Sequence, residues 1–327
     1  MDDFYFKKEY AELYEKAEND VAVQWNYKGP EGKVQHLFIK RRIKTELPGG
    51  PWYDLVTPYG YGGPRVINCT GEKKELLTAF EHAFTDYCQQ NNVVSEFVRF
   101  HVLENNAIDF QDIYNSKFDR YTVGTNLRDY SIEEEFSSKC RKTIRQIERK
   151  GVTSRVTYQP ESLKDFKEVY YSTMERNNAS EYYFFDDAYF DNFLSRFQKN
   201  ILLVEALVGD DVAAVGLYVV FNGIIHCHLS GTLTEYLKFS PAYMIKMATA
   251  SWGKENDVSL IHYGGGSSSS EDDELYRFKK KFGQHTKFPF YIGKKVWNDK
   301  VYQKLCDEKA VAENCVFFPA YRSVLDK

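Results

Sequence analysis

The sequence predicts an α/β (α+β) protein of two domains, each with a mixed, mostly antiparallel sheet flanked by helices. The chain has 327 residues, which is more than one hydrophobic core usually holds. β-rich runs alternate with helical runs along it, and the order of elements in the second half is repeated imperfectly in the first half. We therefore expect an N-terminal domain over residues 1–150 and a C-terminal domain over residues 151–315.

The second half shows the clearer pattern. Gly151 ends a helical run, and Asn222-Gly223 is a strong hairpin signal between two β-rich runs. Ser240-Pro241 combines an N-cap residue with a proline at the first helical position, so a helix should begin at Pro241. The expected elements are strand 152–159, helices 161–178 and 186–200, strands 201–208, 212–220 and 224–230, helix 241–255, strand 258–262, helix 272–282 and strand 288–292.

The first half resembles this order less fully. Its expected elements are helix 4–18, strands 21–25, 34–43 and 52–56, helix 72–90 and strand 95–103. A helix over 132–150 should connect the two domains. Its basic side could contact tRNA or a diphosphate, or could simply face solvent, and it comprises Lys139, Lys142, Arg149 and Lys150.

Composition excludes several classes of protein. The formal net charge of −4 argues against a globally basic nucleic-acid-binding surface. The sequence contains no run of eighteen apolar residues, so no membrane-spanning helix is expected. The first residues lack the features of a secretory signal, so we expect a cytoplasmic protein. The six cysteines have no CxxC spacing, which favours reduced thiols. His226 and His228 have the spacing of metal ligands but no third partner, so no metal is expected.

Several motifs in this order resemble those of the FemAB-related transferases, over nearly the whole chain. The element order of the second half is that of the GNAT acyltransferase fold. The matching motifs are Pro58-Tyr59-Gly60-Tyr61-Gly62-Gly63-Pro64, KTIRQIERKGV from Lys142, Thr173-Met174-Glu175-Arg176-Asn177, Tyr263-Gly264-Gly265-Gly266 and Phe278-Lys279. The resemblance implies tandem GNAT domains and transfer of an aminoacyl group from charged tRNA to an amine of a peptidoglycan precursor. It also implies that residues 316–327 return to the N-terminal domain.

Two glycine-rich segments are candidate binding loops. Tyr59, Gly60, Tyr61, Gly62 and Gly63 follow a predicted strand and could cover a substrate, although such turns are common between elements. Tyr263, Gly264, Gly265 and Gly266 lie between a buried strand and a helix. Their backbone could present N–H groups to an oxyanion or phosphate, or the loop could merely be flexible.

The resemblance also singles out charged residues. It places the Phe278-Lys279 pair near the transferred group, where the Lys279 cation could stabilise an oxyanion or a donor phosphate. It makes Arg176, beside Tyr182, a candidate ligand for an acceptor phosphate. No Ser-His-Asp or Cys-His order is evident, which favours direct attack by an amine. The general base stays open among Asp272, Asp273, Tyr263 and His228.

The segment before the predicted helix at Pro241 bears on which acyl donor the protein uses. Enzymes of this fold that use acetyl-CoA usually hold its pyrophosphate with a glycine-containing loop before the central helix. Here residues 233–242 read LTEYLKFSPA, without glycine. Three hypotheses remain, with no tightly bound cofactor in any of them: aminoacyl-tRNA-dependent transfer to an envelope precursor, acyl-CoA-dependent acylation of an amino sugar or other small amine, and a non-catalytic relative that only binds ligand.

Overall fold

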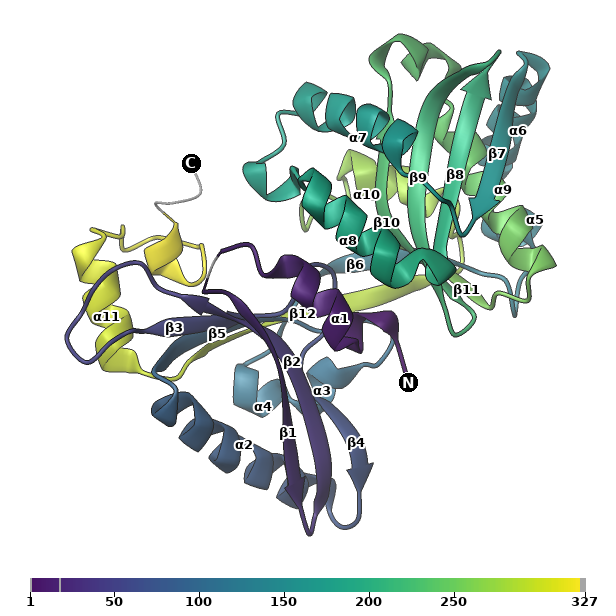
Figure 1. The fold of residues 1–327 in the computed structure, drawn as a ribbon. Helices are drawn as coiled ribbons and strands as arrows, with labels where there is room; N and C mark the ends of the chain where they lie inside the picture. Colours follow the sequence, from purple (N-terminus) through teal and green to yellow (C-terminus); the bar gives the residue numbers. More distant parts are fainter. Residues whose placement is uncertain (1, 18, 324–327) are drawn as a thin grey trace. The chain divides into compact units, whose positions relative to one another are not determined.

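The computed structural model describes residues 2–17 and 19–323, which form two compact units. Unit 1 comprises residues 1–119 and 289–327, and unit 2 comprises residues 120–288. The chain passes between them within two strands, β6 (Lys117–Asn126) and β12 (Lys287–Val296). Both units are mixed α/β structures in which antiparallel strand pairs predominate, as the sequence predicts (Figure 1).

The division between the units differs from the one expected near Gly151. The second unit begins at Arg120, because β6 pairs antiparallel with β11 (Leu260–Gly264), a strand of unit 2. It ends at Phe288 rather than at residue 315, since the chain after that point pairs with β5 of unit 1. Strand pairing, which joins residues distant in sequence, therefore sets the boundary.

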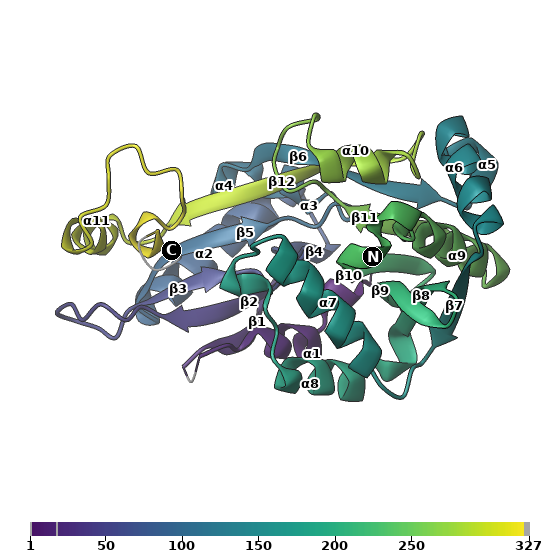
Figure 2. The ribbon, with the colours of Figure 1, turned by 90° about the horizontal axis from the view of Figure 1, so that it is seen from above.

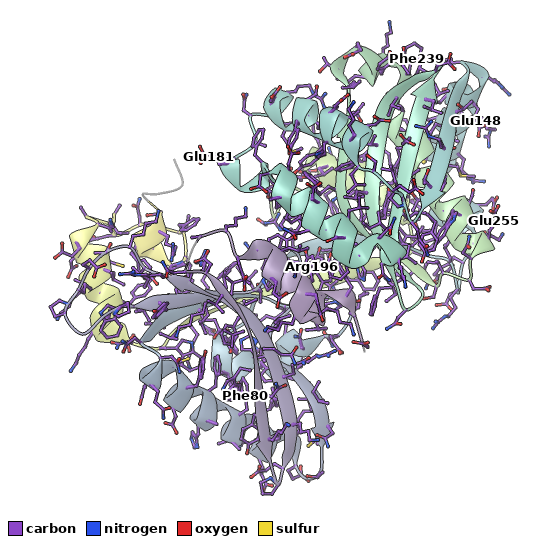
Figure 3. All side chains as sticks on the ribbon, viewed as in Figure 1. Phe80, Glu148, Glu181, Arg196, Phe239 and Glu255 are labelled. Atoms are coloured by element: carbon purple, nitrogen blue, oxygen red, sulfur yellow. The ribbon has the colours of Figure 1, made fainter. Side chains whose placement is uncertain are left out.

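Unit 1 contains a sheet with the strand order β1-β2-β3-β5-β12, and β4 also pairs with β2. Its strands besides β12 are β1 (Val21–Gly29), β2 (Gly32–Arg42), β3 (Tyr53–Val56), β4 (Arg65–Cys69) and β5 (Val93–Arg99). Helix α2 (Lys73–Gln90) packs on it, and the short helices α3 (Asn106–Asp109) and α4 (Gln111–Tyr114) follow β5. Phe80, labelled in Figure 3, belongs to the core between α2 and β1, with its ring 5.8 Å from that of Trp25.

The expected helix over 4–18 is three short pieces instead. They are η1 (Phe4–Phe6), α1 (Lys8–Ala11) and η2 (Glu12–Tyr14), and Glu18 lies outside the described residues. Phe4, Tyr5 and Phe6 are all buried. Three consecutive side chains of a 3₁₀ turn point in different directions, so this turn is packed on all its sides rather than along one helix face.

The C-terminal segment packs on unit 1. Helix α11 (Asp299–Glu308) is followed by η6 (Ala320–Arg322), where the Tyr321 hydroxyl lies 2.8 Å from that of Ser95. The Arg322 side chain donates to the buried Asp54 carboxylate over 2.5 Å. Residues 324–327 of the expected tail lie outside the described part of the chain.

Unit 2 contains a sheet with the strand order β6-β11-β10-β9-β8-β7. Its other strands are β7 (Val152–Tyr158), β8 (Ile201–Val208), β9 (Asp211–Phe221) and β10 (Ile224–Thr232). Helices α7 (Lys164–Arg176) and α8 (Asp187–Phe197) lie on one face, whereas α6 (Ser138–Arg149) and α9 (Ala242–Glu255) lie on the other (Figures 1 and 2). The short elements are α5 (Ile132–Glu135), η3 (Glu181–Tyr183), η4 (Gln198–Asn200), η5 (Thr234–Phe239) and α10 (Glu274–Lys280).

The expected connecting helix 132–150 is part of the core of unit 2. It is interrupted at Phe136, which has an extended backbone, and Ser137 caps the second piece by accepting from the Cys140 N–H over 3.2 Å. Phe136, Ile144 and Ile147 are buried in the core of unit 2. This segment therefore packs within one unit rather than linking two.

The start of α9 also differs from the prediction. Ser240 has a left-handed backbone with φ of 52°, and α9 begins at Ala242 without a side-chain cap. The 3₁₀ helix η5 precedes it and directs the chain into this turn. Ser240 is therefore not the N-cap that the Ser-Pro pair suggested.

Candidate active site

Strands β10 and β11 of unit 2 run parallel and separate partway along. Their paired residues are Ile224 with Leu260, Ile225 with Ile261, and His226 with His262. Beyond this point β10 has a bulge against β9 between Cys227 and Leu229, and β11 continues into the glycine segment Gly264–Gly266. A parallel pair that parts in this way leaves side chains and backbone groups without strand partners, which is where ligands bind in open α/β sheets.

The glycine segment is held by two cations through its carbonyls. The Lys279 ammonium donates to the Gly265 carbonyl over 2.6 Å, and Arg120 donates to the Gly266 carbonyl over 2.9 Å. Gly264 has φ of 77°, in the left-handed region. The two cations therefore fix the orientation of these peptide groups.

The glycines are required for contacts within the chain. A Cβ atom on Gly266 would lie 2.3 Å from an Asp273 carboxylate oxygen, and one on Gly265 would lie 3.0 Å from the Arg120 side chain. Asp273 cannot easily move, because it caps α10 by accepting from the Tyr276 N–H over 2.9 Å. Burial opposes the charge on Asp273, but the hydrogen bonds that it accepts outweigh burial and lower its pKa to about 2.

Replacing Gly266 with alanine should therefore lower the free energy of unfolding by about 1–3 kcal/mol, the usual cost of overpacking. Urea denaturation followed by circular dichroism measures it. Gly71→Ala is the matched control, since its Cβ would meet only Glu75 at 3.8 Å. If Gly266→Ala and Gly71→Ala have the same free energy of unfolding, the Asp273 side chain moves aside without loss of stability.

Lys279 lies on α10 with its side chain partly buried. Burial lowers the pKa of Lys279 to about 8, and the nearby Lys246 ammonium adds to the effect, while Cys227 and Asp273 oppose it. Phe278 turns the other way and packs edge-on against Tyr243 and Phe282, at ring-centre distances of 5.3 and 5.2 Å. Within the predicted Phe278-Lys279 pair, Lys279 thus contacts the glycine segment, and Phe278 supports the core.

Lys246 is a feature of this region that the sequence analysis missed. It lies on α9 and is only 5% exposed. Its ammonium is 3.2 Å from the Tyr218 hydroxyl, 3.6 Å from the Cys227 sulfur and 4.5 Å from the ring centre of Tyr263. Its one signal in the sequence is a charge inside an otherwise apolar stretch, Met244-Ile245-Lys246-Met247.

Tyr263 is buried beneath this cation. Its ring is 1% exposed, and its hydroxyl is hydrogen-bonded to that of Thr125 over 2.8 Å. Tyr263 therefore links Lys246 to the base of the glycine segment. In this arrangement its aromatic face contacts a lysine of the same chain.

Arg176 lies at the end of α7 and contacts the chain that leaves β10. It donates to the Thr232 carbonyl over 2.5 Å and to the Thr234 hydroxyl over 3.2 Å. The side chain of Tyr182, its predicted neighbour, is outside the described part of the structure. Acceptor binding by these two residues stays a prediction.

The predicted binding loop of unit 1 is packed against its own unit. Gly60 and Gly63 have φ of 91° and 86°, and a Cβ would lie 2.4 Å from the Tyr5 ring and 2.9 Å from Val98, respectively. Asn106 donates to the Gly62 carbonyl over 2.9 Å and holds the loop closed. The rings of Tyr59 and Tyr61 are half-buried; that of Tyr61 lies 5.4 Å from the Tyr5 ring, and that of Tyr59 stacks on Tyr14 at 6.1 Å.

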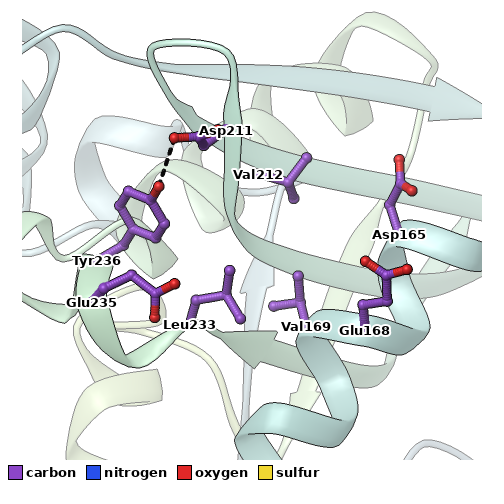
Figure 4. Close-up of a pocket in the computed structure, with 8 residues that line it drawn as sticks. All are labelled: Asp165, Glu168, Val169, Asp211, Val212, Leu233, Glu235 and Tyr236. Atoms are coloured by element: carbon purple, nitrogen blue, oxygen red, sulfur yellow. Dashed lines mark hydrogen bonds between the residues drawn. The ribbon is translucent and has the colours of Figure 1, made fainter.

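An acidic cavity lies beside the chain that precedes α9 (Figure 4). It measures about 360 Å³, and Tyr236 donates to Asp211 over 2.7 Å at its edge. The carboxylates that line it are Asp165, Glu168, Asp211 and Glu235. Negative charge here would repel a pyrophosphate bound before α9.

His226 and His228 lie on the face of β10 away from Lys246. The His228 ring is hydrogen-bonded to the Tyr189 hydroxyl over 2.7 Å, and burial lowers the pKa of His228 to about 3, with His226 adding to the effect. A neutral, buried imidazole of this kind is a poor general base at neutral pH. Over the described residues, no group of three or more His, Cys, Asp or Glu side chains could hold a metal ion.

Comparisons with known proteins identify a domain within unit 2 and the fold of the chain. Residues 135–280, within unit 2, match the family model described as acetyltransferase (GNAT) domain. No curated protein sequence matches the chain. In the described residues, no helix has the length and apolar character needed to cross a membrane.

Solved structures with this fold cover nearly the whole chain. FemX has a TM-score of 0.64 at 14% identity, over 92% of this chain and 94% of that one. L-PGS from Bacillus licheniformis has a TM-score of 0.55 at 15% identity, over 84% of each chain. The DUF2156 domain of a protein described as a lysylphosphatidylglycerol synthetase, from Agrobacterium fabrum, has a TM-score of 0.58 at 12% identity, over 93% and 87%. The predicted resemblance to FemAB-like tandem GNAT proteins is confirmed at the level of the fold.

Proposed function

We propose that this GNAT acyltransferase transfers an aminoacyl group from charged tRNA to an amine of a cell-envelope precursor, of the peptidoglycan type, in the cytoplasm. The observation that carries the proposal is the Lys279 ammonium, held by the Gly265 carbonyl where β10 and β11 part. A cation fixed at that point can stabilise the negative charge that develops on a carbonyl oxygen during acyl transfer.

The choice of an ester donor over acyl-CoA follows from the surroundings of α9. Its leading segment has no glycine, Ser240 adopts a left-handed backbone, and a cavity with four carboxylates lies beside the first residues of that segment. A CoA pyrophosphate would meet repulsion there and no glycine backbone to approach closely. The name of the Agrobacterium fabrum relative, a lysylphosphatidylglycerol synthetase, also supports transfer of an aminoacyl group.

The described side chains suggest a division of roles. Lys279 would act on the transferred carbonyl, and Arg120 would keep the glycine segment in place through Gly266. Gly264, Gly265 and Gly266 would let the donor approach the backbone closely. Tyr59, Gly60, Tyr61, Gly62 and Gly63 in unit 1, and Arg176 with Tyr182 in unit 2, are the proposed substrate-binding residues.

A second candidate is acyl-CoA-dependent acylation of an amino sugar or another small amine. The family model that matches residues 135–280 is described as an acetyltransferase domain, which favours it. It uses the same Lys279 site with a different leaving group. The two candidates therefore differ in donor rather than in chemistry.

Parallel transfer assays distinguish the two candidates. Radiolabelled aminoacyl-tRNA and acetyl-CoA are each incubated with the protein and either a peptidoglycan precursor bearing a free amine or an amino sugar. We expect label to move from tRNA to the precursor and calorimetry to detect no micromolar binding of acetyl-CoA. Transfer from acetyl-CoA alone would replace the first candidate by the second, and binding of either donor without turnover would indicate a ligand-binding relative.

A further inference from the structure

A second cavity in unit 2 is lined mainly by positively charged side chains. Its volume is about 570 Å³, within the range of about 300–1,000 Å³ that is usual for ligand pockets. The charged residues that line it are Arg277, Lys280, Lys281, Lys287 and Glu271. Four cations thus accompany one carboxylate, although the whole chain has a net charge of −4. The positive charge of this cavity is therefore produced by the fold and not by the overall composition.

Two of the cations, at the end of α10, are held by neutral groups. Lys280 donates to the carbonyls of Gly283 and Gln284 over 2.7 and 3.0 Å. Lys281 donates to the Tyr243 hydroxyl over 2.9 Å. Neither lysine forms an ion pair among the described residues, so both hydrogen-bonded ammonium groups keep a charge that a ligand can neutralise.

The other two cations differ from each other. The Lys287 ammonium, at the start of β12, lies 4.0 Å from the ring centre of Tyr121 and also has no ion-pair partner in the described part of the chain. Arg277 pairs with Asp272 at 2.7 Å, so its charge is already neutralised. Lysines in the last turn of a helix often only complement its dipole, but this does not account for Lys287, because it belongs to a strand.

The ammonium groups in the cavity repel one another. Burial lowers the pKa of Lys280, and Lys287 adds to the effect, while Glu135 and Glu271 oppose it. Glu135 is fully buried, and its carboxylate already accepts from the His285 N–H over 3.0 Å. An anion bound in the cavity would offset the repulsion, and phosphate is an anion that lysines commonly bind.

The cavity adjoins the glycine segment of the candidate active site. Tyr276 contributes to both, because it lines the cavity and its Cβ atom would lie 3.0 Å from a Cβ atom on Gly266. Lys280 and Lys281 directly follow Lys279, about 1.5 and 3 Å further along the helix axis. A ligand in the cavity would therefore lie next to the donor carbonyl on which Lys279 is proposed to act.

The positive surface continues onto the start of α6. The Ser137 N–H donates to the Lys281 carbonyl over 2.9 Å, which joins the first turn of α6 to the end of α10. Arg141 interacts electrostatically with the Cys140 thiol, as Lys281 does, and its Nε atom is buried without a hydrogen-bond partner among the described residues. Lys139, in the same turn, is exposed. A ligand with several consecutive phosphates matches this extended surface better than a single anion does.

We propose that this cavity binds the phosphates next to the 3′ end of the donor RNA, with Lys280, Lys281 and Lys287 as the phosphate ligands. The inference rests on the proposed function, in which that 3′ end carries the aminoacyl group, and adds the place where the RNA backbone is held. Lysine contacts to phosphate position the RNA without reading its sequence, so the binding should depend on salt more than on sequence. A concave site favours a chain that enters it over the flat surface of a membrane.

Binding is tested with RNA that carries no aminoacyl group, so that acyl transfer is not needed. The fluorescence anisotropy of a labelled RNA hairpin with a single-stranded 3′ end is measured with the full chain over a range of salt concentrations. Lys281→Gln/Lys287→Gln should weaken binding at least about tenfold. It should also lower the slope of log K against log salt by about 1.4, because each phosphate contact on a single strand contributes about 0.7.

The melting temperature of the double variant is checked against that of the wild type. If it is lower, Lys287→Gln, which replaces an exposed side chain, is measured instead, with half the expected change in slope. Unchanged affinity and slope in a normally folded variant would overturn the inference. A wild type that binds no RNA at low salt would also exclude it.

The matched control is Lys164→Gln/Lys199→Gln, which removes two exposed lysines that do not line the cavity. Lys164 belongs to α7, on the face of the sheet opposite to α6 (Figure 1). The affinity and the slope of this variant should equal those of the wild type. Equal losses in both double variants would show that only the net charge matters, and would contradict binding at this cavity.

Vesicles of phosphatidylglycerol test a membrane surface as the other source of phosphate groups. We expect Lys281→Gln/Lys287→Gln to affect binding to RNA and not binding to the vesicles. If these lysines are needed for the vesicles but not for RNA, the cavity belongs to a membrane surface and the inference is wrong.

The transfer assay separates this inference from the proposed function. With charged tRNA, Lys281→Gln/Lys287→Gln should raise the Michaelis constant for tRNA more than it lowers the rate at saturation. If the wild type transfers from tRNA and this variant has the same kinetics, the cavity is not the RNA site and the proposed function stands. If the wild type transfers from neither donor but binds RNA through these lysines, the proposed function fails and the RNA site stands.

Discussion

Replacing Lys279 with methionine should lower the rate of transfer about a hundredfold at saturating substrate, since losing one preorganised electrostatic contact costs roughly 3 kcal/mol in the transition state. The change keeps the length and the apolar part of the side chain but removes the ammonium that donates to the Gly265 carbonyl over 2.6 Å. The Michaelis constants should change less, because the charge develops on the donor only during reaction. The radiolabelled transfer assay measures both.

The matched control is Arg277→Gln on the same helix. Arg277 is exposed and forms a surface ion pair with Asp272 at 2.7 Å, which should contribute little. Its transfer rate should equal that of the wild type. If Lys279→Met folds normally and transfers at the wild-type rate, Lys279 only holds the glycine segment in place and is not a catalytic residue.

The pH dependence provides a second readout for Lys279. Its pKa is lowered to about 8 by burial and by Lys246, so the ammonium predominates below pH 8 and is lost above it. The wild-type rate should therefore fall as pH rises through about 8, provided that the acceptor amine is already neutral there. Lys279→Met should lack this descending limb. If the rate of the variant falls with the same midpoint pH, the decrease is caused by a group other than Lys279.

Replacing Asp54 with alanine should lower the free energy of unfolding by about 3–5 kcal/mol, the usual cost of removing one partner from a buried ion pair. Asp54 is fully buried. It accepts from Arg41 over 2.8 Å, from Arg322 over 2.5 Å and from the Tyr321 hydroxyl over 3.2 Å. Without the carboxylate, two guanidinium groups would face each other in a partly buried site, and the C-terminal segment would lose its attachment to β3.

Chemical denaturation and limited proteolysis measure the two consequences. Asp54→Ala should shift the urea midpoint downwards and expose the chain after α11 to protease. Glu46→Ala is the control, because its pair with Arg42 at 3.0 Å is exposed and should change stability by less than about 0.5 kcal/mol. Protease resistance equal to that of the wild type would show that Tyr321 and its apolar neighbours hold the segment without Asp54.

Local patterns predicted most of unit 2. The expected strand 201–208 coincides with β8, and Asn222-Gly223 does form the turn between β9 and β10. Such elements are predictable because side-chain alternation and turn chemistry act over a few residues. Strands β4 and β6 and helix α11 were missed. β4 is mostly exposed, and its pairing partner β2 compensates for its weak pattern.

Errors arose where tertiary contacts override a local signal. Ser240-Pro241 has the sequence of a helix start, but η5 forces Ser240 into the left-handed region. The run 132–150 has the period of one helix, but the Ser137 cap and the burial of Phe136 divide it. In both places the local preference is worth about 1 kcal/mol, which packing easily exceeds.

By itself the sequence determined the order of elements from β7 to α10 and the glycine segment after β11, because each is a local pattern in a known order. The family resemblance singled out Lys279. Only the tertiary structure decided the boundary at Arg120, the attachment of Tyr321 and Arg322 to unit 1, and the placement of Lys246 against Cys227 and Tyr263. These contacts join a helix to two strands that no periodicity relates. Burying the Lys246 charge among them depends on the whole sheet of unit 2 being folded, since desolvation is a property of the surroundings and not of the residue.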